Sequence, residues 1–505
     1  MCGLHVFSSF AVQVSKEVFL SAGQLLNEDS HMSLRSLSPL VLLAAVTVSA
    51  AAAEFSSRFD ALKRGASPVQ LYTLLYDTPK GGDLHNHAGG SELPEWLFEV
   101  LTTPSLNGGD TFYTRTRLPV EPDALAPGVR FRTLRRLTYE RLPSSARAEY
   151  VPLASLTATE RAEWCDAFRL DAPGEGRREF FDGLWVRRGD IGYNLPARLE
   201  LLARNIKAFA AEGVRYLETQ VGTDRMTTND GRPIPPDEVA AATRTLLARE
   251  DVASTGMVVR FQETVVRFLP NAEAKLAEAY AFVDANRDLW VALNLAGIEE
   301  NGRGYPQRFL EPFRRLRARY PTLPLSIHAG EMDGPDRHIR DTLLLGASRI
   351  GHGLNLIKDP DTLLLLQQNR RVLVEVALIS NRLLEYVPDL SRHPFPEYLR
   401  TGVPVCLNTD DRGMWDSNLT DEYYTAVTTF HLSWGELVEM GRNSLAYSFA
   451  PADVKRRLLA DYEARVAAFE ARYSGGTVTE ALARLANVRP VTYGYAKRTW
   501  GFEFR

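Results

Sequence analysis

Eight short strand-like runs, seven of them β-rich and the segment GGDLHNH counted with them as the first, constrain the fold of this 505-residue chain more than any other feature of its sequence. The runs span 81–87, 214–222, 255–266, 289–297, 323–331, 349–356, 371–381 and 403–411. Runs that are apolar over most of their length are typical of parallel strands covered on both faces. Because they alternate with amphipathic stretches such as 195–213 and 306–320, they predict an α/β fold, a (β/α)8 TIM barrel.

An open, doubly wound sheet is the alternative architecture. It would be expected to carry a glycine-rich phosphate loop after a strand, and no such loop follows any of the eight runs. Residues from about 103 to 194 lack the alternation, and we interpret them as an insertion after strand 1, on the catalytic face of the barrel. The tail over 416–500 is expected to be helical, with its clearest amphipathic segment at 451–473.

The N-terminal part of the chain differs from the rest. From Met32, the segment MSLRSLSPLVLLAAVTVSAAAAEF has one arginine, an apolar run and then small residues. This order is typical of a secretory signal peptide, and the apolar run is too short for a membrane span. We therefore expect a signal peptide over 32–53, cleaved after Ala50 or Ala53, and a single domain over 54–505. The expected location is secreted or periplasmic, with no stable membrane anchor after cleavage.

Two further expectations concern the same region. Residues 1–31 show no clear pattern, and we interpret them as an upstream segment assigned to the protein in error. The alternative to a signal peptide is that 39–53 forms an alanine-rich helix of the folded protein.

The charge of the chain excludes one class of partner. The formal net charge is −4 and the pI is about 6.2, with lysine and arginine scattered among acidic residues. Proteins that bind nucleic acid gather basic residues into a patch or stripe. The cysteine pair of the zinc deaminases that act on polynucleotides, P-C-x-x-C, is also missing from the sequence. We therefore expect a small-molecule substrate and no nucleic acid.

Polar side chains suited to catalysis stand at the ends of four of the runs. In a TIM barrel these ends meet at one rim, where the active site lies. They are His85 and His87 at the first run, His328 and Glu331 at the fifth, His352 at the sixth, and Asp410 and Asp411 at the eighth. Each has an ordinary alternative: an isolated histidine pair, a histidine in a tight turn, or an aspartate pair that caps a helix. We favour one shared site because all of them fall at the same predicted rim.

A metal site is the simplest use of this arrangement. His85 and His87 are two residues apart, so in a strand both imidazoles point to the same side and can bind one ion. A nitrogen from His328 and an oxygen from Asp410 would complete a set of three nitrogens and one oxygen. Such a set suits Zn²⁺, which lowers the pKa of a bound water molecule toward neutrality. The native metal stays open, because this set binds several divalent ions.

Three more side chains at the rim have expected roles toward a substrate held over the metal. Glu331 could act as a general acid or base, and His352 could orient or deprotonate the water. Asp411 could accept a hydrogen bond from the substrate.

Five motifs, in order along the chain, resemble the adenosine/AMP deaminase family of the amidohydrolase superfamily. They are LHNH, SIHAGE, RIGHGLNL, VEVALISNRL and CLNTDD, and the tail segments LTDEYYTA and NSLAYSFAPADVKRRLL agree with them. The resemblance runs from about residue 79 to 460, apart from most of the insertion. The signal-like segment and the place of the insertion are similar to the secreted adenosine deaminase-related growth factor branch.

The resemblance implies zinc-dependent hydrolytic deamination of adenosine or 2′-deoxyadenosine to inosine or 2′-deoxyinosine. It implies one Zn²⁺ per chain, bound by His85, His87, His328 and Asp410, with Asp410 counted also as a catalytic residue. Glu331 would protonate N1 of the purine while an activated water attacks C6, and ammonia would then leave. His352 would assist the water. Asp411 would hold N7, and the backbone of Gly297 would lie near N3.

Two positions depart from the family pattern. Gly89 stands where many members have an aspartate used on the ribose, and Arg412 follows the aspartate pair where members commonly have proline. We expect Arg412 to be a solvated loop residue, and the alternative is a contact with a substrate phosphate. Asn294 and Gly297 stand at the end of the fourth run, where a two-metal site bridged by a carbamate would need a lysine, so we expect a single metal.

Other functions stay open at this point. The alternative substrates are AMP or an N6-substituted adenine nucleoside. A non-catalytic binding or signalling protein, which would use the insertion as its interaction surface, is disfavoured because all the expected site residues are present. The expected partner is a small purine nucleoside, and the oligomeric state is left open, a dimer included.

Overall fold

The computed structural model describes residues 54–118, 129–172, 174–299, 304–332, 334 and 336–504. Residues 54–64, the described part of the first of two units, are helical, and the main unit begins at Gly65. The predicted signal peptide at 32–53 and the segment 1–31 lie outside the described residues. No helix in the described ranges is both long and apolar enough to cross a membrane.

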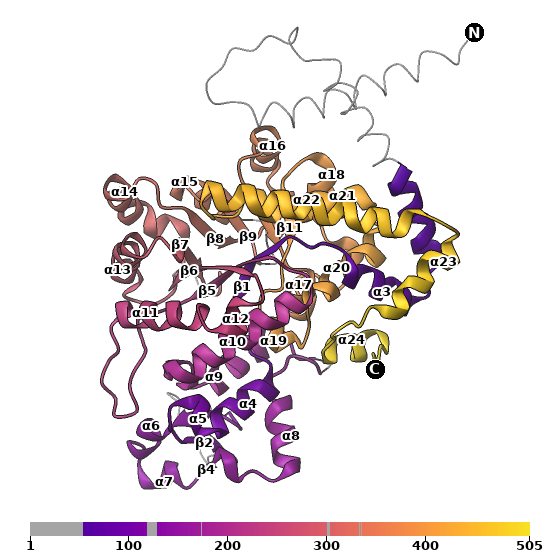
Figure 1. Cartoon of the computed structure of the whole chain (residues 1–505). Coiled ribbons are helices and arrows are strands. Elements are labelled where there is room, and N and C mark those ends of the chain that lie inside the picture. The colour runs from indigo at the N-terminus through magenta and orange to yellow at the C-terminus, as the bar shows by residue number, and fades with distance from the viewer. Residues whose placement is uncertain are drawn as a thin grey trace, which may run out of the picture. The chain divides into compact units, whose positions relative to one another are not determined.

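Eight parallel strands form the central sheet of the main unit and follow one another in chain order (Figure 1). They are β1 (Gly82–His87), β5 (Tyr216–Val221), β6 (Val258–Val266), β7 (Trp290–Ala296), β8 (Leu325–Ala329), β9 (Arg349–His352), β10 (Leu373–Val376) and β11 (Val405–Leu407). A parallel bridge between Asn86 and Asp410 joins the two ends of the sheet. The Asp410 N–H donates to the His85 carbonyl at 2.9 Å, and the His87 N–H donates to the Asp410 carbonyl at 3.2 Å. The fold is thus a nearly closed (β/α)8 TIM barrel, and the eight predicted strands are confirmed.

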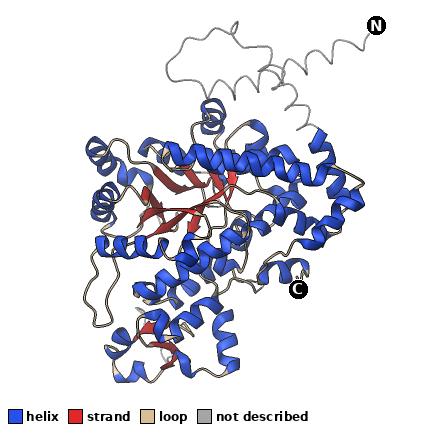
Figure 2. Cartoon of the chain, viewed as in Figure 1, coloured by secondary structure: helices blue, strands red, loops and turns tan. Residues whose placement is uncertain are grey.

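Helices surround the strands, as Figure 2 shows. Those on the barrel wall are α10 (Leu195–Ala211), α11 (Pro236–Leu247), α12 (Glu250–Ala253), α13 (Ala272–Ala285), α14 (Leu310–Arg319), α15 (His338–Leu345), α16 (Pro360–Asn369), α17 (Leu378–Leu383), α18 (Phe395–Thr401) and α19 (Arg412–Trp415). The predicted helix at 195–213 is α10. It begins after Asn194, whose side chain accepts a hydrogen bond from the Ala197 N–H, and its buried residues include Leu201 and Ile206.

Seven further helices of the main unit precede β1, follow it directly or form the tail. They are α3 (Pro68–Asp77), α4 (Pro94–Thr102), α20 (Leu419–Phe430), α21 (Trp434–Ala446), α22 (Ala452–Ser474), α23 (Val478–Ala483) and α24 (Gly494–Trp500). The predicted amphipathic segment at 451–473 is α22, which packs on α21. Its buried residues recur every three or four positions, from Val454 and Leu458 to Tyr462 and Val466.

The insertion has a sheet of its own. Its three antiparallel strands, in the order β3-β2-β4, are β2 (Phe112–Arg115), β3 (Thr133–Arg135) and β4 (Tyr150–Pro152). Its helices are α5 (Pro104–Asn107), α6 (Arg136–Glu140), α7 (Ser144–Arg147), α8 (Ala158–Asp166), the π-helix η3 (Glu179–Leu184) and α9 (Trp185–Arg187). Phe112, Trp164 and Phe168 pack with Leu97 of α4 and Leu201 of α10 in one apolar cluster. This cluster attaches the insertion to the barrel.

Candidate active site

The four residues predicted to bind a metal meet where the barrel closes. His85 and His87 lie on the same side of β1, His328 is the last but one residue of β8, and Asp410 follows β11. The His87 Nε2 atom is 3.2 Å from Asp410 Oδ1 and 3.2 Å from His328 Nε2. The His85 Nε2 atom is 3.5 Å from the same Asp410 oxygen. The structure therefore brings the four donors into one cluster.

The donor atoms of this cluster fit a divalent cation. His85 Nε2 and Asp410 Oδ1 are buried and have no hydrogen-bond partner among the described residues. Buried polar atoms are rarely left without a partner, and imidazole nitrogens with a carboxylate oxygen are ligands that zinc accepts. Asp410 and the neighbouring His352 also hold positive φ angles, 53° and 62°. Such strain in residues other than glycine is concentrated at functional sites.

Two side chains orient the histidines, a role that the sequence analysis assigned to neither of them. Glu375 Oε2 lies 2.8 Å from His85 Nδ1, and Asn294 Oδ1 lies 3.1 Å from His328 Nδ1. Each contact occupies Nδ1 and leaves Nε2 directed to the cluster, which is the usual arrangement of metal-binding histidines. The available signal was a glutamate in an otherwise apolar strand, LVEV at β10, where burial on both faces requires a partner for the charge.

Glu331 and His352 lie together at the edge of this cluster. Their closest atoms, Glu331 Oε2 and His352 Nε2, are 3.5 Å apart, and the Glu331 side chain is 12% exposed. Burial, followed by repulsion from Asp410 and Glu299, raises the pKa of Glu331 well above its usual value. Burial and the neighbouring His85 lower the pKa of His352 to about 3. The site thus favours the protonated form of the Glu331 carboxyl beside a neutral imidazole, an arrangement suited to an acid and a base.

The Asp411 side chain fits beside the backbone of Gly90 because residue 90 has no side chain. A Cβ atom on Gly90 would lie 1.5 Å from Asp411 Oδ1, and this oxygen has no hydrogen-bond partner among the described residues. Burial, followed by repulsion from Asp410, raises the pKa of Asp411 well above its usual value. Asp411 therefore keeps one carboxyl oxygen available for a ligand, in surroundings that favour its protonated form.

Gly297 follows β7 with a φ of 108°, where a Cβ atom would lie 2.7 Å from the Phe268 ring. Its carbonyl accepts hydrogen bonds from Arg267 Nε at 2.8 Å and Nη2 at 2.5 Å. The same guanidinium donates to the His328 carbonyl at 2.7 Å. Arg267 therefore ties the predicted substrate-binding backbone to the strand end that carries a predicted metal ligand.

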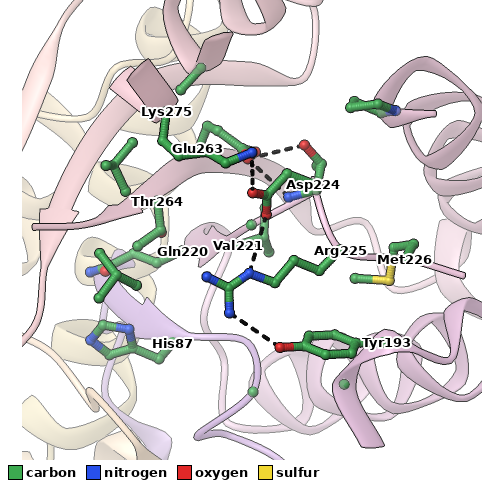
Figure 3. A pocket seen from close by; sticks show the side chains of 18 of the residues that line it. His87, Tyr193, Gln220, Val221, Asp224, Arg225, Met226, Glu263, Thr264 and Lys275 are labelled. Carbon is green, nitrogen blue, oxygen red and sulfur yellow. Dashed lines mark hydrogen bonds and ion pairs between the residues drawn. The ribbon is translucent and has the colours of Figure 1, made fainter. Parts of the chain in front are cut away.

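A cavity of about 300 Å³ opens beside the histidine cluster. His87 reaches it and is 18% exposed, and Figure 3 shows Gln220 next to it on the cavity wall. The insertion contributes Trp185, Arg188 and Tyr193 to the same wall. The volume lies at the lower end of the range for small-ligand pockets. The insertion thus helps to enclose the space that leads to the predicted site.

Gln220 is a buried polar side chain that lacks a partner. It is opposite His87 in the register between β1 and β5 and is 3% exposed. Neither its amide oxygen nor its amide nitrogen has a hydrogen-bond partner among the described residues. Leaving such a group unpaired costs about 1–3 kcal/mol, so a ligand that pairs with it would be stabilised. The sequence analysis did not single out Gln220.

Four basic side chains line the cavity, and each already has a partner. They are Arg188 with Glu92, Arg198 with the Gly222 carbonyl, Arg225 with the Tyr193 hydroxyl, and Lys275 with Asp224 and Glu278. A phosphate needs cations that are free to face it. The cavity therefore offers no basic cluster set aside for a phosphate.

The expectation that Arg412 is a solvated loop residue is wrong. The side chain is fully buried and pairs with Glu212, whose Oε1 atom is 2.8 Å from Arg412 Nη2. Its guanidinium lies 4.2 Å from the centre of the Phe209 ring and 5.5 Å from that of Tyr493. The carboxylate and the rings offset the cost of burying the charge. The pair is structural and leaves Arg412 no access to a substrate phosphate.

Comparisons with known proteins identify the family of this chain. The family model for adenosine deaminase matches residues 194–464, more than half of the chain. The adenosine deaminase of Enterococcus faecalis is 31% identical over 263 residues, which cover 52% of this chain and 74% of the relative. The chain belongs to the adenosine deaminase family and is an aminohydrolase.

Solved structures share the fold. An amidohydrolase from Burkholderia ambifaria with bound Zn has a TM-score of 0.57 at 20% identity, covering 82% of this chain and 95% of that one. An N6-mAMP deaminase from Arabidopsis has a TM-score of 0.57 at 21% identity, covering 77% of this chain and 99% of that one. At these identities the likeness concerns the barrel alone.

Proposed function

We propose that this member of the adenosine deaminase family hydrolyses adenosine and 2′-deoxyadenosine to inosine and 2′-deoxyinosine, with release of ammonia. The observation that carries the proposal is the close grouping of Glu331, His352 and Asp410, whose ligand atoms lie within 4.8 Å of one another. The family assignment supports deamination of an adenine compound. The test is the loss of the adenine absorbance, with ammonia release, when the protein is mixed with each nucleoside.

One Zn²⁺ per chain is the metal we propose, held by His85, His87, His328 and Asp410. Three imidazole nitrogens and one carboxylate oxygen support this choice, as does the bound Zn of the Burkholderia protein that shares the fold. When bound, the ion would lower the pKa of a water molecule and so supply a nucleophile at neutral pH.

Glu331 is the proposed acid for the purine N1. Addition of water at C6 places negative charge on N1, so a proton held at Glu331 stabilises the transition state more than the ground state. The raised pKa of Glu331 favours the protonated form that this role needs. His352, which burial keeps neutral, is the proposed acceptor of the proton that the attacking water loses.

Asp411 is the proposed partner of N7. The N7 atom of adenine only accepts hydrogen bonds, so the carboxyl that faces it must donate. The raised pKa of Asp411 supports this role and revises the expectation that Asp411 accepts a hydrogen bond. The backbone of Gly297, on the neighbouring strand end, remains the proposed contact of N3.

A nucleoside is favoured over AMP as substrate. The cavity next to His87 has only basic side chains that are already paired, and Arg412 is buried away from it. Gln220, by contrast, has two unpaired amide atoms beside His87. An amide can both donate to and accept from sugar hydroxyls. We therefore propose that Gln220 binds the sugar, in a chain that has Gly89 in place of the aspartate of other members.

Replacing Gln220 by leucine tests this assignment. We expect kcat/KM for adenosine to fall about 10-fold, the cost of losing roughly 1.4 kcal/mol of hydrogen bonding. The fall should be much smaller for 9-methyladenine, which has no sugar. Both rates are measured on the wild type and on Gln220→Leu at equal metal content. Equal falls for the two substrates would remove Gln220 from the sugar site and leave the proposed reaction intact.

We also propose that the protein is exported. The order of charge, apolar run and small residues from Met32 supports this. N-terminal sequencing of the protein recovered outside the cytoplasm should give a first residue of Ala51 or Glu54. A secreted protein that still begins at Met1 or Met32 would contradict the signal peptide.

A further inference from the structure

A ring of buried polar side chains crosses the barrel interior beneath the histidine cluster. Six consecutive strands, β5 to β10, each contribute one member, and every member has 0% exposure. They are Glu218, Gln262, Asn294, Ser326, Arg349 and Glu375. TIM barrels fill such layers mainly with branched apolar residues. Burying polar side chains costs free energy unless they are hydrogen-bonded to one another. The hydrogen bonds of this ring therefore show which function it can have.

One chain of contacts runs from the ring to His85. Arg349 Nη2 is 2.5 Å from Glu218 Oε2, and Arg349 Nε is 2.6 Å from Glu375 Oε1. The other oxygen of Glu375 is 2.8 Å from His85 Nδ1. Arg349 remains charged and keeps Glu375 an acceptor. His85 must therefore carry a hydrogen on Nδ1, which leaves Nε2 as the ring atom that can bind a cation.

A second chain runs from the same Glu218 to His328. The amide of Gln262 donates to Glu218 Oε2 at 3.1 Å and to the Leu84 carbonyl at 3.1 Å. Both partners only accept, so this end of the amide must be its nitrogen, and its oxygen must face Asn294. Asn294 Nδ2 donates to that oxygen at 3.2 Å.

The orientation of Asn294 then decides the state of His328. With its nitrogen bound to Gln262, Asn294 presents its oxygen to His328 Nδ1 at 3.1 Å. His328 must donate from Nδ1, which leaves the lone pair on Nε2, the atom 3.2 Å from His87 Nε2. An amide alone could bind the ring in either orientation, since oxygen and nitrogen differ little in size. Glu218, two strands away, and the Leu84 carbonyl together remove this freedom through Gln262.

We propose that the buried Glu218–Arg349 pair is a positioning unit that sets the tautomers of two proposed metal ligands, His85 and His328. Two hydrogen-bond chains, through Glu375 and through Gln262 and Asn294, carry its effect. This inference rests on the proposed metal site. The unit prepares both rings to bind a cation through Nε2 before the cation arrives.

Replacing Gln262 by leucine interrupts only the chain to His328. Asn294 is then free to turn its nitrogen toward the ring, which favours the tautomer with the hydrogen on Nε2. We expect the Kd for Zn²⁺, measured on the full chain by competition with a chelator of known affinity, to rise about 10- to 100-fold. Adding Asn294→Asp should restore the affinity, because a carboxylate accepts from Nδ1 in either orientation. A merely structural role of Gln262 would not predict this rescue.

The control is Asp110→Asn in the insertion. It breaks a buried ion pair, Arg135 Nε to Asp110 Oδ2 at 2.6 Å, that has no contact with the ring. Its Kd for Zn²⁺ should match that of the wild type even if it unfolds at a lower temperature. If Gln262→Leu yields no soluble protein, Asn294→Leu interrupts the same chain one strand later.

Two results would overturn the inference. One is wild-type zinc affinity in the Gln262→Leu variant, or in Asn294→Leu where that variant replaces it. The other is a folded double variant in which Asn294→Asp restores nothing. A wild-type protein that binds no Zn²⁺ would instead refute the proposed metal site, so the two failures are distinguishable.

Discussion

Replacing His328 by alanine is expected to remove both the bound metal and the deaminase activity. His328 supplies one of four donors, and its Nε2 atom lies 3.2 Å from that of His87. Without it, the cluster keeps only three donors. The chemistry that the metal supplies is worth several kcal/mol, so the rate should fall about 1,000-fold or more. Metal content per chain and the rate of adenosine loss are measured on the same preparation.

A second buried histidine provides the control for His328→Ala. His393 is 3% exposed, and its Nε2 atom pairs with Asn381 Oδ1 at 3.1 Å, outside the donor cluster. His393→Ala therefore creates a comparable cavity but should keep its metal. Full metal content in His328→Ala would remove this residue from the ligand set.

Glu331→Gln is expected to keep the metal and to lower kcat by about 10²- to 10⁴-fold, the range for a positioned acid or base. Glutamine has nearly the size of the carboxyl but cannot pass a proton to N1. The backbone should stay in place, because Glu299 accepts from the Gly330 and Glu331 N–H groups at 2.9 and 3.0 Å. Stopped assays with adenosine give the rate, and metal analysis confirms that the site is loaded.

The same variant separates two interpretations of Glu331. If Glu331 were a metal ligand, its replacement would lower the metal content together with the rate. If it only shaped the cavity, KM would rise while kcat stayed near the wild-type value. Wild-type kcat in a metal-loaded Glu331→Gln protein would contradict the role of Glu331 as the acid.

The parts of this protein that sequence analysis predicted well are those with local signals. The strands are read from short apolar runs, and two histidines at a spacing of two share one face of β1. The order of the strands then places His328 and Asp410 at the same rim. No contact had to be known to predict this cluster.

The residues that sequence analysis missed depend on register between strands. Glu375 reaches His85 across the barrel, and Gln262 reaches Asn294 between neighbouring strands. Their signal was present, since a polar residue in a strand buried on both faces needs a partner. That partner is distant in the sequence, so the local pattern does not identify it. A search for polar residues within the predicted strands would have found Glu375 and Gln262.

For Arg412, the sequence analysis made a prediction, and that prediction was wrong. It follows two aspartates at the start of a loop, a context that indicates a solvated side chain. Its burial depends on Glu212 and Phe209 of the α10 region and on Tyr493 near the C-terminus. These residues are distant in sequence, so only the folded chain reveals the pair. The strands of the insertion were likewise missed, because β2, β3 and β4 have only three or four residues each.

The most direct test of the central claim is the ultraviolet spectrum of the full, zinc-loaded chain mixed separately with adenosine, 2′-deoxyadenosine, AMP and adenine. We expect loss of the adenine absorbance and equimolar ammonia with the two nucleosides, and much slower change with AMP and with adenine. Turnover of AMP in preference to adenosine would contradict the nucleoside assignment. A zinc-loaded protein that leaves all four compounds unchanged would contradict the proposed reaction itself.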